Sequence, residues 1–451
     1  MPIDLGETLD PKSPEGVELL KDLQGNILKG HGRDHAMHLF ICFGTPKSEE
    51  SHAKCLEGAR KWIGDMVTNV TSAAAQRSDP GKKKVFTMLL LSSQGYEFLG
   101  ERRPRDGAFR DGMRERRNRL KDPPVEQWAP RYQLEEEFIH ALVIVASKKA
   151  NELDATKARI LNELAPFGGS ILVDERGRQE HDKHEKKRAI EHFGYADGVS
   201  QPQFFEDGRA EAKSFDQRTP LKLVLEEDRH GNGGYGSFFV YRLLEQNVAS
   251  FDAAVERVAQ ELGVSPELAG AMAVGRFKNG TPLTTHEAPK RDYDPKNDED
   301  FDYDADRDGD RCPLHSHIRK VNPRGSLGFF PNLLAREQKR RIARRGITYT
   351  EDDNHKGLIF MCFQSDIKDQ FEFMQKSWAN SHFFSKPGTG LDPVIGQDGG
   401  PQEPNNFPNW PTGYGSDGRK RIRFDEHVRL LGGEYFFAPS IAGLKELATR
   451  K

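Results

Sequence analysis

The stretch Phe138-Ile139-His140-Ala141-Leu142-Val143-Ile144-Val145 is a long apolar run with the length of one β-strand. Apolar residues at helical spacing follow it, so a helix is predicted over residues 151–164. The apolar positions of that helix are Leu153, Ala155, Ala158, Leu161 and Leu164. A strand that leads into an amphipathic helix is a unit of folds that mix α and β structure.

The same order of elements extends upstream from this unit. Residues 38–43 and 85–91 have the character of strands, and residues 49–67 and 95–99 have helical spacing. Strands and helices that alternate in this way indicate an α+β fold, compatible with a ferredoxin-like sheet.

A second set of alternating elements begins near residue 221. Strands are expected at residues 237–243, 357–363 and 434–437, and helices at residues 250–262, 265–275 and 366–378. Ser265 is expected to cap the second of these helices, with Pro266 at its first position. We therefore predict a lead-in over residues 1–36, a first α+β domain over residues 37–220 and a second over residues 221–451.

The composition is that of a polar globular protein. The chain has 451 residues, of which 35% are hydrophobic and 30% charged, and its formal net charge is −3. This balance gives no electrostatic reason to expect a nucleic-acid partner. No apolar run approaches the roughly eighteen residues that a membrane helix needs, so no membrane partner is expected.

The N-terminus and the cysteines bear on location. Residues 1–7 lack the basic and then apolar pattern of a signal peptide. Cys42, Cys55, Cys312 and Cys362 are widely separated and form no CxxC pair. They are interpreted as reduced thiols, so a cytoplasmic location is expected.

A candidate metal or haem ligand lies in the segment Cys312-Pro313-Leu314-His315-Ser316-His317-Ile318-Arg319-Lys320-Val321-Asn322-Pro323-Arg324. A neutral imidazole is the commonest protein ligand for a transition metal or a haem iron. His315 and His317 are both candidates for this role. A single histidine in such a loop is more often a hydrogen-bonded residue without a ligand.

An acidic run over residues 291–311 precedes these histidines. Within it, Asp304-Ala305-Asp306-Arg307-Asp308-Gly309-Asp310 matches the start of an EF-hand loop. The twelfth position counted from Asp304 is His315, whereas an EF-hand needs a glutamate there. Residues 302–310 are therefore interpreted as a solvated loop, with a divalent-cation site as the alternative.

Two other segments supply a carboxylate and a cation. Asp197 lies in the glycine-flanked loop at residues 194–198, and Arg344 lies in a strongly basic run. Taken alone, Asp197 is a turn residue and Arg344 is one charge on a solvated helix. Together with a histidine ligand they supply what peroxide cleavage on a haem iron needs. The histidine pushes electron density to the iron, the carboxylate moves a proton, and the arginine stabilises the negative charge on the leaving oxygen.

Several ordered segments resemble the dye-decolourising peroxidase family, most closely its longer bacterial and fungal-like members. The GxxDG motif of the family is matched by residues 194–198, its CP…HIRK.NPR segment by residues 312–324 and its RRGI.Y segment by residues 344–349. Residues 23–28 and 432–439 also look like family segments, so the resemblance covers nearly the whole chain.

The resemblance implies two ferredoxin-like domains with antiparallel sheets and one haem b, held mainly by the C-terminal domain. It makes His317 the proximal iron ligand, Asp197 the distal acid–base group and Arg344 the distal cation. Leu358 and Phe360 match the apolar distal residues of the family, and they are equally well explained as alternate residues of a buried strand.

The family also has a carboxylate behind the proximal histidine, for which Asp392 and Glu426 are candidates. The adjacent Arg344 and Arg345 leave the register of the distal cation open by one residue.

The implied function is a haem peroxidase that uses hydrogen peroxide, through compound I, to oxidise bulky phenolic or dye-like donors. Its implied partners are hydrogen peroxide and an aromatic electron donor, and a homo-oligomer is compatible with the sequence. Two alternatives stay open: a haem-binding protein of the same superfamily without a true peroxidase role, and a divalent-cation-binding module. The simultaneous presence of His317, Asp197 and Arg344 favours the peroxidase.

Overall fold

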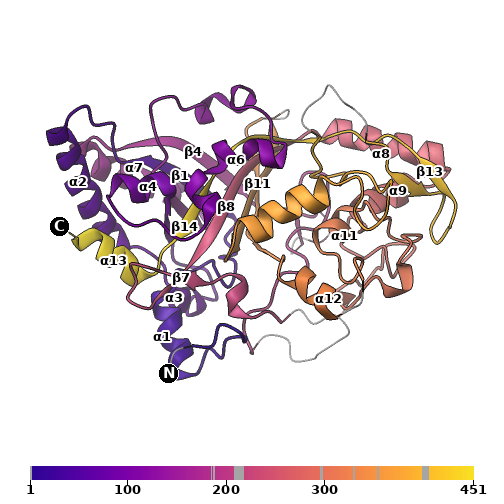
Figure 1. Ribbon diagram of the computed structural model, residues 1–451, viewed down its shortest axis with the longest axis horizontal. Helices are drawn as coiled ribbons and strands as arrows, with labels where there is room; N and C mark the ends of the chain where they lie inside the picture. The colour runs from indigo at the N-terminus through magenta and orange to yellow at the C-terminus, as the bar shows by residue number, and fades with distance from the viewer. Residues whose placement is uncertain are drawn as a thin grey trace.

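The computed structural model describes residues 3–183, 185, 188–207, 218–294, 298–328, 331–352, 355–398 and 406–450. A large antiparallel sheet runs through its centre with the strand order β10-β11-β8-β14-β2-β3-β1-β4 (Figure 1). These strands are β1 (His35–Cys42), β2 (Phe86–Ser92), β3 (Ala141–Ser147), β4 (Ser170–Arg178), β8 (Tyr235–Gln246), β10 (Ile347–Thr350), β11 (Lys356–Gln364) and β14 (Val428–Ala438). Two short strands extend this sheet: β7 (Glu226–Glu227) pairs with β8, and β9 (Ala343–Arg344) pairs with β11. Two small two-stranded sheets lie apart from it. One is formed by β5 (Glu180–His181) and β6 (Ala189–Ile190), and the other by β12 (Asn409–Pro411) and β13 (Arg419–Arg421).

The two ends of the large sheet approach each other. The Thr348 hydroxyl of β10 donates to the carbonyl of Arg178 in β4 at 2.5 Å and accepts from the backbone N–H of Glu180 at 3.1 Å. Gly177 makes this approach possible, because a Cβ there would lie 2.5 Å from a methyl carbon of Ile347. The sheet therefore curls towards a barrel.

The strands bury both of their faces. Successive side chains of a strand point to opposite faces, and accordingly Phe40 and Leu142 belong to the cluster inside the curled sheet, whereas Leu39 and Val143 belong to the cluster outside it. The outer cluster is covered by α2 (Glu49–Val67), α7 (Ala150–Leu164) and α13 (Ile441–Thr449). Continuous burial explains why these strands have near-continuous apolar sequences.

The prediction of an α+β fold with antiparallel strands is confirmed. The two halves of the chain do not form separate sheets, since β14 pairs with β8 of its own half and with β2 of the first half, through Phe436 opposite Ser92 and Phe437 opposite Leu91. The domain boundary between residues 220 and 221 stays a prediction.

Most predicted elements lie where they were expected, with three differences. The strand expected from residue 138 begins at Ala141, and the strand expected at residues 434–437 extends back to Val428. The helix expected over residues 366–378 is of the wide π type in the segments Lys368–Glu372 and Met374–Ala379. Its N–H groups bond five residues back, as from Glu372 to Ile367 at 2.9 Å.

Four helices of the second half gather at the end of the molecule opposite α2 and α13 (Figure 1). They are α8 (Val248–Leu262), α9 (Pro266–Val274), α11 (His317–Val321) and α12 (Pro331–Gln338). Ser265 caps α9 as predicted, with its hydroxyl accepting from Leu268 N at 3.2 Å. The other α-helices in the described part of the chain are α1 (Pro14–Asp22), α3 (Ala73–Arg77), α4 (Ser93–Phe98), α5 (Gly107–Asp111) and α6 (Met113–Leu120).

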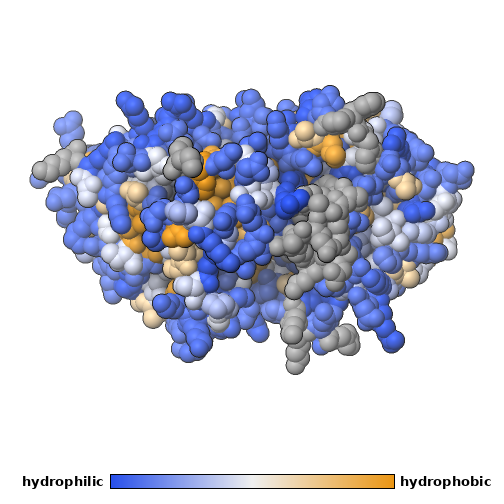
Figure 2. Space-filling model, turned by 90° about the horizontal axis from the view of Figure 1, so that it is seen from below, coloured by the Kyte–Doolittle hydropathy of each residue, from blue (hydrophilic) through white to orange (hydrophobic). Residues whose placement is uncertain are grey.

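The face shown in Figure 2 is mainly hydrophilic, with its hydrophobic residues in small separate groups. The mean hydropathy of −0.74 agrees with this view. Among the described residues, no helix combines the length and the apolar character required to cross a membrane.

Candidate active site

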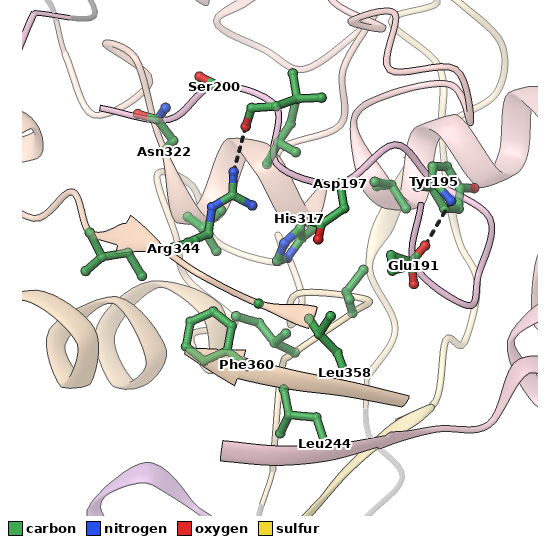
Figure 3. Close-up of a pocket in the computed structure, with 18 of the residues that line it drawn as sticks. Glu191, Tyr195, Asp197, Ser200, Leu244, His317, Asn322, Arg344, Leu358 and Phe360 are labelled. Atoms are coloured by element: carbon green, nitrogen blue, oxygen red, sulfur yellow. Dashed lines mark hydrogen bonds between the residues drawn. The ribbon is translucent and has the colours of Figure 1, made fainter. Parts of the chain in front are cut away.

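A cavity beside the sheet brings together the five residues predicted for the site. His317, Asp197, Arg344, Leu358 and Phe360 all line it (Figure 3). They come from α11, from the loop after β6, from β9 and from β11. The fold thus assembles groups that lie far apart in the sequence.

His317 stands at the first position of α11 and is held from behind by a carboxylate. Its Nδ1 lies 2.9 Å and 3.2 Å from the two carboxylate oxygens of Asp392. Asp392 also accepts hydrogen bonds from the backbone N–H groups of Val394 at 2.8 Å and Ile395 at 3.0 Å. Burial opposes the ionisation of Asp392, but His317 and these donors outweigh it and hold the pKa of the carboxyl below its ordinary value.

The geometry distinguishes the two carboxylates that the sequence left open. Asp392 contacts His317, whereas Glu426 accepts a hydrogen bond from Asp398 N at 2.9 Å. Because Asp392 occupies Nδ1, the remaining ring nitrogen Nε2 is the one available to the cavity. The His317 side chain keeps 21% exposure, while that of Asp392 has none.

His315 has entirely different surroundings. Its ring is fully buried and meets the indole of Trp410 edge-on at 4.3 Å between centroids. It does not line the cavity. Burial lowers the pKa of His315 to about 3, so the ring is neutral. His315 is therefore a core residue, and His317 is the histidine of the pair that lines the cavity.

The shape of its loop directs Asp197 to the cavity. Gly194 and Gly198 adopt φ angles of +89° and +74°, which favour glycine. The backbone N–H of Asp197 donates to Ala189 O at 2.9 Å, and that of Ala196 donates to Lys278 O at 2.9 Å. Asp197 lines the cavity together with His317 (Figure 3).

Arg344 reaches the cavity from a strand and not from a solvated helix. It lies on β9 opposite Cys362 of β11, and its guanidinium donates to Val199 O at 2.6 Å. Burial lowers its pKa, but an arginine remains charged at any working pH. Val199 belongs to the segment just after Asp197, so the Arg344 side chain is bound to the loop that carries Asp197.

The neighbouring Arg345 points elsewhere. It donates from Nε to Asn26 O at 2.6 Å and from a terminal nitrogen to Ile27 O at 2.7 Å. Its partners belong to the glycine-containing lead-in of the chain. Of the two adjacent arginines, the structure therefore places Arg344 at the cavity.

The apolar wall of the cavity comes from the central strands. Leu358 and Phe360 alternate on β11 with Ile359 and Met361, which belong to the cluster inside the curled sheet. Leu244 on the adjacent β8 continues this wall (Figure 3). Leu358 and Phe360 are alternate residues of one strand and form part of the cavity wall, and their role as distal residues stays a prediction.

Sequence reasoning missed several charged residues of the cavity wall. Arg276 forms two hydrogen bonds with Glu299, at 2.5 Å and 2.8 Å. Arg324 donates to Glu299 at 3.2 Å and to the hydroxyl of Ser200 at 2.7 Å. Glu191 also lines the cavity. Arg324 ends the Asn-Pro-Arg segment that matches the family, which was a usable signal, whereas Arg276 and Glu191 lie outside the matched segments.

The residues present fit a haem. An imidazole with a free Nε2 faces the cavity, an apolar strand wall suits the porphyrin faces, and several arginines suit its carboxylates. His317 would hold the iron.

The acidic loop is committed to contacts within the protein. The carboxylate of Asp306 accepts from the backbone N–H groups of Arg311 and Cys312, each at 2.9 Å, and from Arg319 at 3.0 Å. Three further carboxylates of the loop each pair with a basic side chain, namely Asp304 with Arg307, Asp308 with Lys386 and Asp310 with Arg419. In the described part of the chain, no three His, Cys, Asp or Glu residues are grouped as a metal site would need.

Two family models match the chain. The DyP dimeric alpha+beta barrel domain matches residues 22–175, and the C-terminal domain of Dyp-type peroxidases matches residues 193–383. The multifunctional dye peroxidase DyP2 of Amycolatopsis sp. is 37% identical, over 99% of this chain and 100% of its own length. Dye-decolorizing peroxidase msp1 of Mycetinis scorodonius is 28% identical, over 94% of this chain and 87% of its own length.

The fold agrees with solved structures. The DyP-type peroxidase of Anabaena sp. superposes with a TM-score of 0.89 at 36% identity, covering 98% of this chain and 99% of that one. The likeness confirms the ferredoxin-like α+β class that the sequence predicted. The chain belongs to the dye-decolourising peroxidase family.

Proposed function

We propose that this protein is a haem b peroxidase that uses hydrogen peroxide to oxidise bulky phenolic or dye-like donors. One observation carries the proposal: His317, whose Nδ1 is bound by Asp392, lines the same cavity as Asp197 and Arg344. A haem carrier needs the histidine alone, and a cation-binding module needs none of these residues. Family membership supports the same conclusion.

On the proximal side, His317 and Asp392 act as a pair. The haem, when bound, supplies the redox-active iron. The Asp392 carboxylate fixes the orientation of the His317 ring and makes its Nε2 a stronger electron donor, because it accepts the hydrogen bond from Nδ1. Asp392 itself is held by Val394 and Ile395.

On the distal side, Asp197 and Arg344 have separate roles in the cleavage of peroxide: Asp197 transfers a proton and Arg344 stabilises negative charge. Asp197 is placed to take a proton from one oxygen of hydrogen peroxide and to return it to the other, which would leave as water, while a bound haem would take up the remaining oxygen and supply the two electrons. Arg344 stabilises the negative charge that develops on the departing oxygen. The apolar wall of Leu358 and Phe360 excludes water, which strengthens both electrostatic effects.

The test is a visible spectrum of protein expressed with added haem, recorded before and after one equivalent of hydrogen peroxide. A Soret band that peroxide converts rapidly, and that a phenol or a dye restores, supports the proposal. Absence of a Soret band contradicts any haem function. A Soret band that peroxide leaves unchanged favours a haem-binding protein of the same superfamily. The cytoplasmic location and a homo-oligomeric state stay predictions.

A further inference from the structure

A second carboxylate lines the same cavity close to Asp197. Glu191 follows β6 and accepts three hydrogen bonds. One of its oxygens accepts from Tyr195 N at 2.9 Å (Figure 3), and the other accepts from Phe193 N at 2.9 Å and from the side-chain amide of Gln246 at 2.5 Å. Both oxygens of the carboxylate are thus engaged, by donors from residues 193 and 195 and from β8.

These bonds close the loop that carries Asp197. In the backbone, Glu191 N donates to Tyr195 O at 3.1 Å and Gly194 N donates to Glu191 O at 2.9 Å. The Glu191 side chain accepts hydrogen bonds from the N–H groups of Phe193 and Tyr195, whereas the Glu191 backbone binds Gly194 N and Tyr195 O. Gln246 lies on the central strand β8, so this contact ties the loop to the sheet.

Burial of the Glu191 carboxylate costs free energy of solvation, so the residue is expected to have a role that offsets this cost. Burial raises the pKa of Glu191, the negative charge of Asp197 raises it further, and the bonds from Gln246, Phe193 and Tyr195 act in the opposite direction. An amide side chain would avoid that cost. It offers only one acceptor oxygen, however, and its NH₂ group would face a backbone N–H.

We propose that Glu191 is a positioning residue for Asp197. Its two oxygens fix the loop so that the Asp197 carboxylate faces the cavity and is set for proton transfer. Glu191 binds its own loop and Gln246, so its effect on the reaction passes through Asp197. This inference rests on the proposed peroxidase function.

The first test compares Glu191→Gln with the control Glu245→Gln, which changes a partly exposed carboxylate next to Gln246 on β8. Haem uptake and the Soret band are expected to be unchanged in both, because the proximal side is untouched. The rate constant for the peroxide-driven Soret change is expected to fall roughly 10- to 100-fold in Glu191→Gln, within the range of general acid–base effects. The control should match wild type.

A double-mutant cycle separates positioning from general damage. If Glu191 acts through Asp197, adding Glu191→Gln to Asp197→Ala causes no further loss in the peroxide rate constant. Losses that multiply would contradict the inference. If Asp197→Ala alone leaves the rate unchanged, the proposed role of Asp197 fails instead, so the two failures are distinguishable.

Amide hydrogen exchange supplies a test that needs no haem. In haem-free Glu191→Gln, exchange should rise at least 10-fold in the segment 191–197 and stay at the wild-type rate elsewhere. Wild-type protection in that segment, or wild-type peroxide kinetics, would overturn the inference. If Glu191→Gln does not fold, Glu191→Asp keeps both acceptor oxygens at a shorter reach, and the same local exchange and selective kinetic loss are expected. Wild-type behaviour of that variant also counts against the inference.

Discussion

The Nδ1 atom of His317 lies 2.9 Å from Oδ2 of Asp392, and the two residues are 75 positions apart in the sequence. Asp392 is fully buried at its side chain and is itself held by two backbone N–H groups. These contacts fix the orientation of the His317 ring.

Replacing Asp392 by Asn removes the negative charge behind His317 and keeps the shape. We expect the reduction potential of the bound haem to rise and haem affinity or peroxide reactivity to fall by about 10- to 100-fold, as for other outer partners of ligating histidines. Spectroelectrochemistry and haem titration measure these effects. Glu426→Gln is the control, because Glu426 binds Asp398 N instead of the histidine. Equal effects of the two changes would contradict the assignment.

Substitutions of His317 and His315 are expected to have different effects on haem binding and on stability. His317→Ala is expected to lose the Soret band, since it removes the proposed iron ligand. His315→Ala should keep the band but lose roughly 1–3 kcal/mol of unfolding free energy, because it leaves a cavity beside Trp410. Haem titration and urea unfolding check both. A Soret band lost in His315→Ala and kept in His317→Ala would show that the ligand is the other histidine.

Adjacent arginines provide a matched pair. Arg344→Leu should slow the peroxide reaction by about 10²- to 10³-fold, the cost of removing one charge-stabilising donor. Arg345→Leu should leave that rate near wild type and lower the unfolding free energy by about 1–3 kcal/mol, because the carbonyls of Asn26 and Ile27 lose their donor. Stopped-flow absorbance and denaturant unfolding measure the two quantities, and a reversed pattern would refute the register.

The acidic loop should not respond to divalent cations. Its carboxylates at Asp304, Asp306, Asp308 and Asp310 are occupied by arginines, a lysine and backbone N–H groups. Millimolar calcium or manganese, or excess chelator, is therefore expected to leave the melting temperature unchanged within about 1 °C. By contrast, a cation bound at 100 times its Kd would add about 2.7 kcal/mol to the free energy of unfolding and would clearly raise the melting temperature. Thermal denaturation followed by circular dichroism checks this.

The sequence predicted the class of fold because the strands are strongly apolar and the helices are strongly periodic. It did not predict the joining of the two halves into one sheet, since the pairing of β14 with β2 is a long-range contact that leaves no local pattern. The π-type hydrogen bonds after Ile367 were also not predicted, because the apolar residues of so short a segment do not distinguish i→i+5 from i→i+4 bonding.

For the site, ordered motifs led to His317, Asp197 and Arg344, and all three line one cavity. Asp392 could only be offered beside Glu426, because it lies in a loop region without periodicity. Glu191 went unnoticed since a single glutamate carries no spacing signal, and its function is visible only in its three hydrogen bonds.

The position of β14 has a consequence for biosynthesis. It is the last strand of the sheet in chain order, yet it lies between β8 and β2, and its Leu430 lines the cavity. Strands from the first half can pair among themselves as they leave the ribosome, but β2 and β8 can be joined only after β14, which ends at residue 438, has been made. The finished cavity, and with it the capture of haem, must therefore follow translation of nearly the whole described chain, so nascent intermediates expose two open sheet edges that chaperones would need to shield.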